Sequence, residues 1–313
     1  MPFEIPKTAY SGKIREITLG KGDKAVTVGG ESAYPFYLFE GQMPNLPRIA
    51  MEVYDMPPED WAEAALEPFA DVANDPVAWA QKCIKDYGAE MICLQLLSTD
   101  PNGENRPADE ATAVVKKVAD AIDVPLIVWG TANHDKDTEV LRAVAEAVQD
   151  KSLILGPVEE ADHKKIGAAA IGYKHVVIAS TPIDINLAKQ LNILLGNLGV
   201  PDDLLVIDPT VSGVGYGIEY CYSVMERMRM AALTQQDTKL QFPIICNIAK
   251  ETWKTKEAKT KDDPKLGNAK KRGILLEALS ATILLMAGAD VLIMRHPDAI
   301  KLVREMITDL TAK

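Results

Sequence analysis

Residues 125–156 read PLIVWGTANHDKDTEVLRAVAEAVQDKSLILG, and this stretch decides the fold. It begins with an apolar run, residues 125–130, of the kind found in buried strands. Residues 138–150 follow, with apolar side chains spaced as on one face of a helix, and a second apolar run, residues 152–156, ends the unit. A strand, a helix and a further strand in this order predict the unit from which parallel sheets are built.

The same alternation continues on both sides of this stretch. Eight apolar runs are expected as strands, at residues 47–53, 89–97, 125–130, 152–156, 175–180, 204–208, 243–248 and 289–294. The runs are almost continuously apolar, which is typical of strands that are covered on both faces. Eight strand–helix units predict a (β/α)8 TIM barrel as a single domain over residues 1–313. A doubly wound open sheet is the alternative, because alternation alone does not show closure.

The chain before the first barrel strand is expected to form a β-hairpin within residues 1–30. Residues 13–20 and 23–30 alternate apolar and polar side chains about the turn from Gly20 to Gly22. A hairpin in this place can cover the N-terminal mouth of a barrel. Its presence therefore favours the closed barrel over the open sheet.

Composition narrows the classes of function. The 313 residues are 47% hydrophobic and carry a net charge of −11, which argues against binding to nucleic acid or to a membrane surface. The N-terminal residues show no signal-peptide pattern. The cysteines lie far apart without a CxxC pair, so no metal site is expected in this chain and a cytoplasmic setting is predicted. They are Cys83, Cys93, Cys221 and Cys246.

In a (β/α)8 barrel the chemistry lies where the strands end and enter the following loops. The acidic side chains expected at this mouth are Asp55, Asp100, Asp208 and Glu251, and the amides Asn133 and Asn247 are expected beside them. An Asp with neighbouring Asn side chains can hydrogen-bond a pterin ring. The same residue types also cap helices, and their spacing shows no pair of nucleophile and base.

Residues 207–220, IDPTVSGVGYGIEY, place a glycine cluster between a strand and a helix, as phosphate-binding loops do. The spacing of Gly213, Gly215 and Gly217 departs from the G-x-G-x-x-G fingerprint, and no Walker lysine follows. We therefore predict that the glycines supply tight turns and low bulk at the mouth. A large flat ligand or a partner backbone could then come close.

The histidines form no metal-binding motif. His134 and His296 are expected at the mouth. His296 follows Arg295 at a strand end, and it is interpreted either as a ligand contact or as a helix-entry residue with local hydrogen bonds.

Two connections at the mouth, residues 54–74 and 249–270, are much longer than usual. They contain Trp61, Phe69 and Trp253, a large share of the aromatic residues. Long loops on a functional face often meet a partner, so these side chains are expected to be partly exposed in the isolated chain and to form a partner interface.

Four stretches are long and distinctive: residues 181–201 (TPIDINLAKQLNILLGNLGVP), 206–233 (VIDPTVSGVGYGIEYCYSVMERMRMAAL), 243–259 (PIICNIAKETWKTKEAK) and 287–300 (AGADVLIMRHPDAI). They resemble the small (delta) subunit of the corrinoid iron–sulfur protein of the acetyl-CoA (Wood–Ljungdahl) pathway. Together with the barrel layout, the resemblance covers essentially the whole chain.

This resemblance implies a barrel similar to pterin-dependent methyltransferases and a heterodimer with a large subunit that carries a [4Fe–4S] cluster and the corrinoid. It implies that methyl groups pass from methyltetrahydrofolate, through a methyltetrahydrofolate:corrinoid methyltransferase, to the corrinoid and then to CO dehydrogenase/acetyl-CoA synthase. This chain would bind no cofactor alone. In agreement, Asp162 directly abuts His163, so the D-x-H-x-x-G spacing that ligates corrinoid cobalt is missing.

The resemblance also implies that the barrel mouth faces the corrinoid and shields it. The candidate contacts, chosen by strand-end position, are Asn133, Asp208, Thr210, Gly213, Gly215, Asn247, Arg295 and His296. No catalytic residue is assigned, because the expected chain is a non-catalytic subunit. The alternative is a stand-alone pterin-dependent methyltransferase with its own active site.

Overall fold

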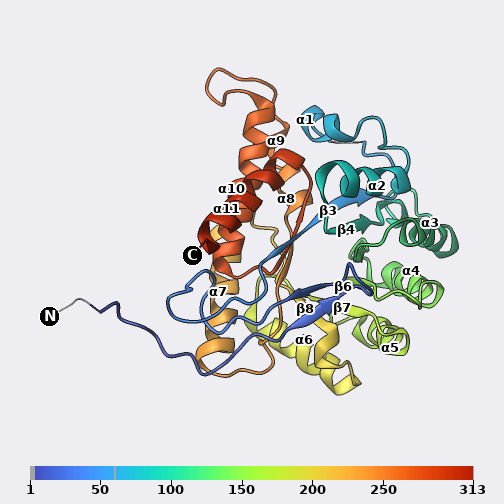
Figure 1. Cartoon of the computed structure of the whole chain (residues 1–313). Helices are drawn as coiled ribbons and strands as arrows, with labels where there is room; N and C mark the ends of the chain where they lie inside the picture. Colours follow the sequence, from blue (N-terminus) through green and yellow to red (C-terminus); the bar gives the residue numbers. More distant parts are fainter. Residues whose placement is uncertain (1–3, 60, 313) are drawn as a thin grey trace.

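Eight parallel strands form the barrel in the computed structural model, which describes residues 4–59 and 61–312 (Figure 1). In chain order they are β3 (Arg48–Tyr54), β4 (Met91–Gln95), β5 (Leu126–Trp129), β6 (Ile154–Val158), β7 (Val176–Ser180), β8 (Leu205–Asp208), β9 (Ile245–Asn247) and β10 (Val291–Met294). The sheet runs from β8 through β7, β6, β5, β4, β3 and β10 to β9. A parallel bridge between Ile207 and Ile244 joins its two ends. The predicted barrel is confirmed, and the open-sheet alternative is wrong.

The outer layer consists of one long helix after each strand. These helices are α2 (Pro76–Tyr87), α3 (Ala108–Ala121), α4 (His134–Ala147), α5 (His163–Tyr173), α6 (Ile185–Leu198), α7 (Ile218–Thr234), α10 (Ala269–Ala287) and α11 (Pro297–Thr311). All residues of β4 and of the strands from β6 to β10 are buried, as their unbroken apolar runs predict. None of the helices in the described ranges is long and apolar enough to cross a membrane.

Capping side chains fix where several helices begin, just beyond the strand ends. Asp75 accepts hydrogen bonds from the first backbone N–H groups of α2, and Asp184 does the same for α6. Gly88 and Gly199 end these two helices in the left-handed conformation that favours glycine. Both ends of each of these helices are therefore set by local residues.

The predicted N-terminal hairpin is confirmed. Strands β1 (Ile17–Leu19) and β2 (Val26–Val28) pair antiparallel, with Ile17 opposite Val28. The Arg15 N–H donates to the carbonyl oxygen of Gln241, just before β9, at 2.9 Å. The hairpin therefore covers the N-terminal end of the barrel and leaves the C-terminal mouth as the accessible face.

The two long connections at the mouth contain short helices. The first holds α1 (Glu63–Leu66) and the 3-10 helix η1 (Glu67–Phe69), and the second holds α8 (Ile248–Trp253) and α9 (Lys256–Lys259). Two further 3-10 turns, η2 (Leu97–Thr99) and η3 (Asp202–Leu204), follow β4 and precede β8. In Figure 1 the chain around α9 projects beyond the barrel, above the start of α10.

Candidate functional site

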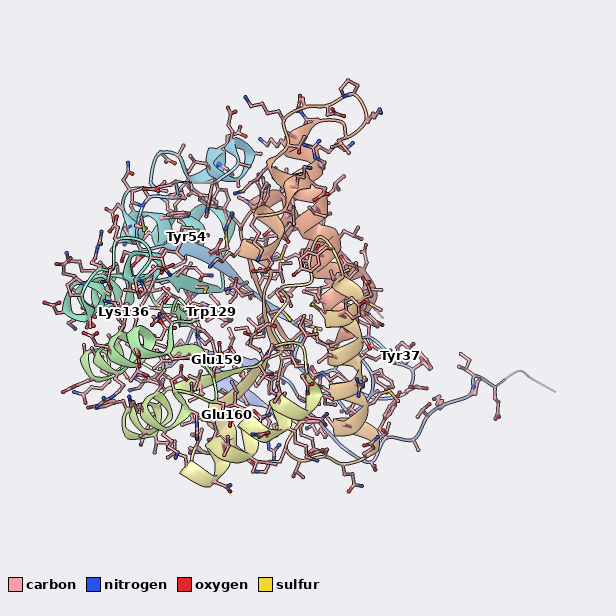
Figure 2. All side chains as sticks on the ribbon, turned by 180° about the vertical axis from the view of Figure 1, so that it is seen from behind. Tyr37, Tyr54, Trp129, Lys136, Glu159 and Glu160 are labelled. Carbon is pink, nitrogen blue, oxygen red and sulfur yellow. The ribbon has the colours of Figure 1, made fainter. Side chains whose placement is uncertain are left out.

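Two hollows lie at the C-terminal mouth, and Lys250 of α8 lines both of them. The larger, about 530 Å³, is lined by Arg295, Tyr54 and Trp61 together with the start of the first long connection, and we name it the Arg295 hollow. The smaller, about 340 Å³, contains Asp208, and we name it the Asp208 hollow. Figure 2 labels Tyr54 of the first hollow, and Trp129 and Glu159 of the second.

Asp208 ends β8 inside its hollow and is buried. Its Oδ2 accepts a hydrogen bond from Ser180 Oγ at 2.8 Å, and its Oδ1 accepts one from Thr210 N at 2.9 Å. Thr210 has a φ of +50°, so this second bond holds an unusual turn in place. Burial raises the pKa of the Asp208 carboxyl to about 7. The group therefore changes its protonation state near neutral pH.

Asn247 ends the neighbouring strand β9 and lines the same hollow. Its side chain is buried, and its Oδ1 accepts no hydrogen bond from any residue that the structure describes. A buried carbonyl oxygen without a donor costs free energy. This oxygen has almost no solvent-accessible surface, so a ligand donor in the Asp208 hollow would reach it only after the side chain turned.

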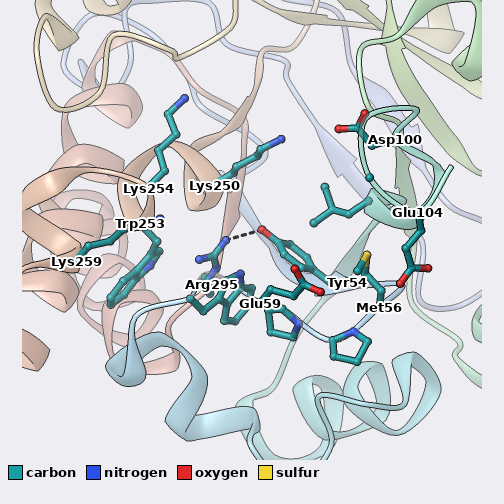
Figure 3. Close-up of a pocket in the computed structure, with 15 residues that line it drawn as sticks. Tyr54, Met56, Glu59, Asp100, Glu104, Lys250, Trp253, Lys254, Lys259 and Arg295 are labelled. Atoms are coloured by element: carbon teal, nitrogen blue, oxygen red, sulfur yellow. Dashed lines mark hydrogen bonds between the residues drawn. The ribbon is translucent and has the colours of Figure 1, made fainter.

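Arg295 follows β10 and forms the floor of the other hollow through a buried network (Figure 3). Its Nε donates to Glu52 Oε2 at 2.7 Å, and its Nη2 donates to the Tyr54 hydroxyl at 2.9 Å. The guanidinium lies 3.6 Å from the centre of the Trp61 ring. Gln95 donates to the second carboxylate oxygen of Glu52 at 3.1 Å. Both charges are therefore paired and hydrogen-bonded.

Glu277 of α10 is hydrogen-bonded to the backbone at the end of β10 and so fixes the position of Arg295. Its Oε1 accepts from Arg295 N at 2.6 Å, and its Oε2 accepts from His296 N at 3.0 Å and from Trp253 Nε1 at 2.9 Å. Burial raises the pKa of Glu277 to about 7. Sequence reasoning missed this residue. The signal was present, because Glu277 is the single acidic residue in the long apolar helix of residues 269–287.

His296 does not reach the mouth, so the prediction that it lies there as a ligand contact is wrong. Its side chain is buried, and its Nδ1 accepts a hydrogen bond from Asp298 N at 3.1 Å, which caps the start of α11. The imidazole also stacks on the Trp253 ring, with 5.9 Å between the ring centres. Burial lowers the pKa of His296 to about 4, so the ring is neutral. The interpretation as a helix-entry residue is the correct one.

The other residues predicted to contact the corrinoid do not lie in a single site. Asp208, Thr210 and Asn247 come together in one hollow, and Arg295 lies in the other. Asn133 lines neither hollow, because its side chain caps α4 by accepting from Lys136 N at 3.1 Å.

The glycine loop packs against the chain itself. A Cβ on Gly213 would lie 2.6 Å from the carbonyl oxygen of Gly217, and a Cβ on Gly215 would lie 2.7 Å from Thr255 Cγ2. Gly215 also has a φ of +95°, which a larger side chain rarely adopts. A larger side chain such as Leu at position 215 would therefore strain the backbone and collide with Thr255. Both glycines meet local packing needs, and low bulk toward a ligand stays a prediction.

The expected exposure of the long-connection aromatics is wrong for two of the three. Phe69 and Trp253 are buried, while Trp61 is half-buried. Phe69 packs on Trp79 with 5.3 Å between ring centres, and the Trp253 indole is bonded to Glu277. The short helices turn these side chains inward, against the barrel.

Exposed aromatic side chains lie instead on the glycine loop and at the start of α7. Tyr216 is 81% exposed and Tyr220 is 66% exposed. Sequence reasoning passed over them, although both stand within the quoted stretch 207–220, on either side of Gly217.

The remaining acidic residues at the mouth have separate roles. Asp55 is buried and accepts from Ser98 N at 3.1 Å, whereas Asp100 and Glu251 line the Arg295 and Asp208 hollows respectively. His134 lies 3.1 Å from Asp162, and this contact raises the pKa of the imidazole. No group of three or more His, Cys, Asp or Glu side chains in the described ranges is arranged to hold a metal ion.

Comparison with known proteins assigns the family. Residues 16–310 match the family described as CO dehydrogenase/acetyl-CoA synthase delta subunit. The chain belongs to this family. Acetyl-CoA decarbonylase/synthase complex subunit delta from Archaeoglobus fulgidus is 38% identical over 99% of this chain and 71% of its own length. The subunit of that name from Methanocaldococcus jannaschii is 33% identical over 100% of this chain and 78% of its own.

The solved structures that are similar share the barrel with this delta-subunit family member. Dihydropteroate synthase from Stenotrophomonas maltophilia, with imidazole in its active site, superposes with a TM-score of 0.59 over 86% of this chain and 94% of its own, at 14% identity. The enzyme from Xanthomonas albilineans in complex with 7,8-dihydropteroate gives 0.57 over 87% and 96%, also at 14% identity. This likeness supports the fold.

The buried ion pair predicts a large effect on stability. Arg295→Met leaves the Glu52 carboxylate buried without its charged partner, so we expect the free energy of unfolding to fall by about 3–5 kcal/mol. Arg48→Met removes a surface pair with Glu90 and should change it by about 1 kcal/mol or less. Urea unfolding of both variants gives the comparison. Equal, small losses would show that the Glu52 charge is not held by Arg295.

Asp208 predicts a pH-dependent effect. Its pKa is raised on folding, so the unfolded chain ionises first and wild-type stability falls as the pH rises from about 4 to about 7. Asp208→Asn keeps the side-chain shape and removes the charge. We therefore compare the free energy of unfolding of the variant with that of wild type at each pH. The variant-minus-wild-type difference should be on the order of 2 kcal/mol more favourable to the variant at pH 8 than at pH 4.5. Urea unfolding at both pH values measures this, and an unchanged difference would contradict the raised pKa.

Proposed function

We propose that this chain is the small subunit of a corrinoid methyl carrier and that its barrel mouth caps a corrinoid held by a larger partner subunit. Membership of the delta-subunit family supports a place in a CO dehydrogenase/acetyl-CoA synthase complex. The observation that carries the capping role is the form of the mouth. Two solvent-open hollows lie side by side and share Lys250, which gives a broad surface suited to covering a large flat group.

The mouth exposes polar groups and aromatic rings that could contact a ligand. Tyr216 is exposed on the glycine loop whose first residues line the Asp208 hollow, Tyr220 is exposed at the start of α7, and each combines an apolar ring with a hydroxyl group. Lys250 extends from α8 between the hollows, next to Lys254 (Figure 3). Such side chains can hydrogen-bond the amide groups at the edge of a corrin ring while they exclude water from its face. They fit a corrinoid approaching from outside the barrel.

The corrinoid, when bound, would supply a cobalt atom that takes the methyl group from methyltetrahydrofolate, by way of a separate methyltransferase, and gives it to acetyl-CoA synthase. The role of this chain is to cover the corrinoid, to orient it and to release it. Tyr216, Tyr220 and Lys250 are exposed and form no side-chain hydrogen bond within the described residues, which suits repeated opening toward two different methyl-transfer partners.

The exposed tyrosines provide the test. Tyr216→Ala combined with Tyr220→Ala should slow methyl transfer to and from the assembled corrinoid complex by about 30-fold or more, because the rim loses about 1–2 kcal/mol of contact per ring. The matched control is Tyr37→Ala with Phe39→Ala, since these exposed rings lie between β2 and β3, and Figure 2 shows Tyr37 well apart from Tyr54 and Trp129. Stopped-flow absorbance of the corrinoid measures the rates. Wild-type rates in the double rim variant would remove the capping role.

A second function, the stand-alone pterin-dependent methyltransferase, is favoured by one observation. The Asp208 hollow holds an unpaired Asn247 oxygen beside a carboxyl that is protonated below about pH 7. A pterin ring carries adjacent donors and acceptors that such a pair could bind. This candidate is an enzyme, whereas the first is a carrier subunit, so the isolated chain distinguishes them.

We expect the chain purified alone to contain neither cobalt nor iron in stoichiometric amount, since its four cysteines are buried and separate. We also expect it not to transfer a methyl group from methyltetrahydrofolate to free cobalamin. Metal analysis and an absorbance assay check the two statements. Transfer by the isolated chain that Asp208→Asn abolishes would establish the stand-alone enzyme in place of the carrier subunit.

A further inference from the structure

A buried acidic side chain lies at the N-terminal end of the barrel, away from the mouth. Glu31 stands in the connection between β2 and β3, and only 5% of it is exposed. Its Oε2 accepts no hydrogen bond from any residue that the structure describes. A buried carboxylate without a partner costs free energy, because the interactions that it loses with water are not replaced. The protonated, uncharged form of Glu31 is therefore favoured in the folded chain.

Two charged side chains line a small cavity with Glu31, and they are already paired with each other. Arg229 of α7 donates from Nη2 to Asp290, the residue before β10, and both side chains are buried. The Arg229 guanidinium also donates to the carbonyl oxygen of Gly288 from Nη2 at 2.6 Å, and to that of Phe242 from Nη1 at 3.2 Å. One guanidinium thus serves two buried carboxyl groups, and Glu31 is the surplus acid.

The other titratable groups beside this cluster do not neutralise the surplus acid. One is the thiol of Cys246 in β9, which faces the same pair of charges. Burial raises the pKa of this thiol, so it stays uncharged. The other is the carboxylate of Glu16 beside Gly30, which is exposed and paired with Lys13 at 2.8 Å.

Glu31 lies at the centre of the chain that closes this end of the barrel, residues 10–47, which we name the N-terminal strap. Its carbonyl oxygen accepts from Ile14 N at 2.9 Å, and Gly12 N donates to the Leu233 carbonyl oxygen of α7 at 2.8 Å. Figure 1 shows the strap, in blue, running past α7. The cavity beside the Glu31 carboxyl measures about 10 Å³, which is room for about one water molecule. An ionised Glu31 can therefore be hydrated only if the strap moves.

We propose that Glu31, Asp290 and Arg229 form a proton-dependent latch that fixes the N-terminal strap over the base of the barrel. With a proton on one of the two carboxyls, the cluster is neutral and the strap is closed. When both carboxyls ionise, the negative charge of Asp290 repels that of Glu31, whose side chain turns toward water, and the strap opens locally. The latch is separate from the mouth and does not depend on the proposed function.

The direction of the pH dependence follows from the environment of Glu31. Burial, and next the negative charge of Asp290, raise the pKa of the Glu31 carboxyl well above its usual range, although Arg229 acts in the opposite direction. The latch is therefore at full strength below the pKa of an unfolded glutamate, about 4.3, and it weakens as the pH rises through the raised value.

Hydrogen exchange with mass spectrometry, corrected for the pH dependence of intrinsic exchange, measures local opening of the strap. From about pH 5.5 to about pH 8.5, the protection of wild-type strap amides should fall by about tenfold or more, since one pKa unit corresponds to a tenfold change. Glu31→Gln has an uncharged side chain of the same shape, and its strap should keep its protection within about twofold. The matched control is Glu16→Gln, on the same strap but exposed, and it should behave as wild type.

Wild-type protection that does not change with pH would overturn the latch, whether or not any variant folds. A fall of wild-type size in Glu31→Gln would overturn it as well. Asp290→Asn also leaves a single carboxyl beside Arg229, so its strap should likewise keep its protection, and a fall equal to that of wild type contradicts the proposal. Loss of the pH dependence in Glu16→Gln would assign the effect to the overall charge of the strap and would also reject the latch.

Discussion

The ion pair between Arg295 and Glu52 is the constraint on which the mouth depends. Two charges that are removed from water are stable only if they are paired and their remaining hydrogen-bonding capacity is used. Gln95 donates to the Glu52 carboxylate, the Tyr54 hydroxyl accepts from the Arg295 guanidinium, and Glu277 accepts from the backbone N–H of Arg295. These bonds require β3, β4, β10 and α10 to keep one relative position. The network therefore sets the shape of half the mouth before any ligand arrives.

The two hollows differ in how far their polar groups are already satisfied. The carboxylate of Glu52 and the guanidinium of Arg295 bond one another, so that side of the mouth is a rigid floor. In the other hollow the amide oxygen of Asn247 lacks a donor, and the carboxyl of Asp208 gains or loses a proton near neutral pH. The carboxyl that titrates near neutral pH is therefore on the side of β8, whereas the charges on the side of β10 are paired with one another.

The sequence predicted the barrel because its signal is local and repeated. Each strand is a short apolar run, each helix has its own periodicity, and residues such as Asp75 and Gly88 mark helix ends without reference to the rest of the chain. The candidate site was predicted only in part, because strand-end position brings Asp208 and Asn247 together but gives no side-chain direction. His296 stands at a strand end and turns inward. Gly215 needs a positive φ, which its spacing alone does not reveal.

The wrong prediction that Phe69 and Trp253 are exposed has the same cause. Phe69 and Trp253 lie in long connections whose short helices are too brief to show a period, so the inward turn of their side chains could not be predicted. Glu277 could have been noticed as an acid in an apolar helix, but its three partners come from α8 and from the end of β10. Contacts between segments far apart in the sequence depend on the tertiary structure, so no local sequence pattern predicts them.

Helix α10 has one side that faces the mouth network and one side that faces solvent. On its inner side Glu277 bonds the indole of Trp253 and the backbone at Arg295, and so holds the mouth. On its outer side Leu275 and Leu279 face solvent, two residues before and after that glutamate. The place of this helix on the barrel and the order of the mouth at Arg295 are therefore linked through one rigid element.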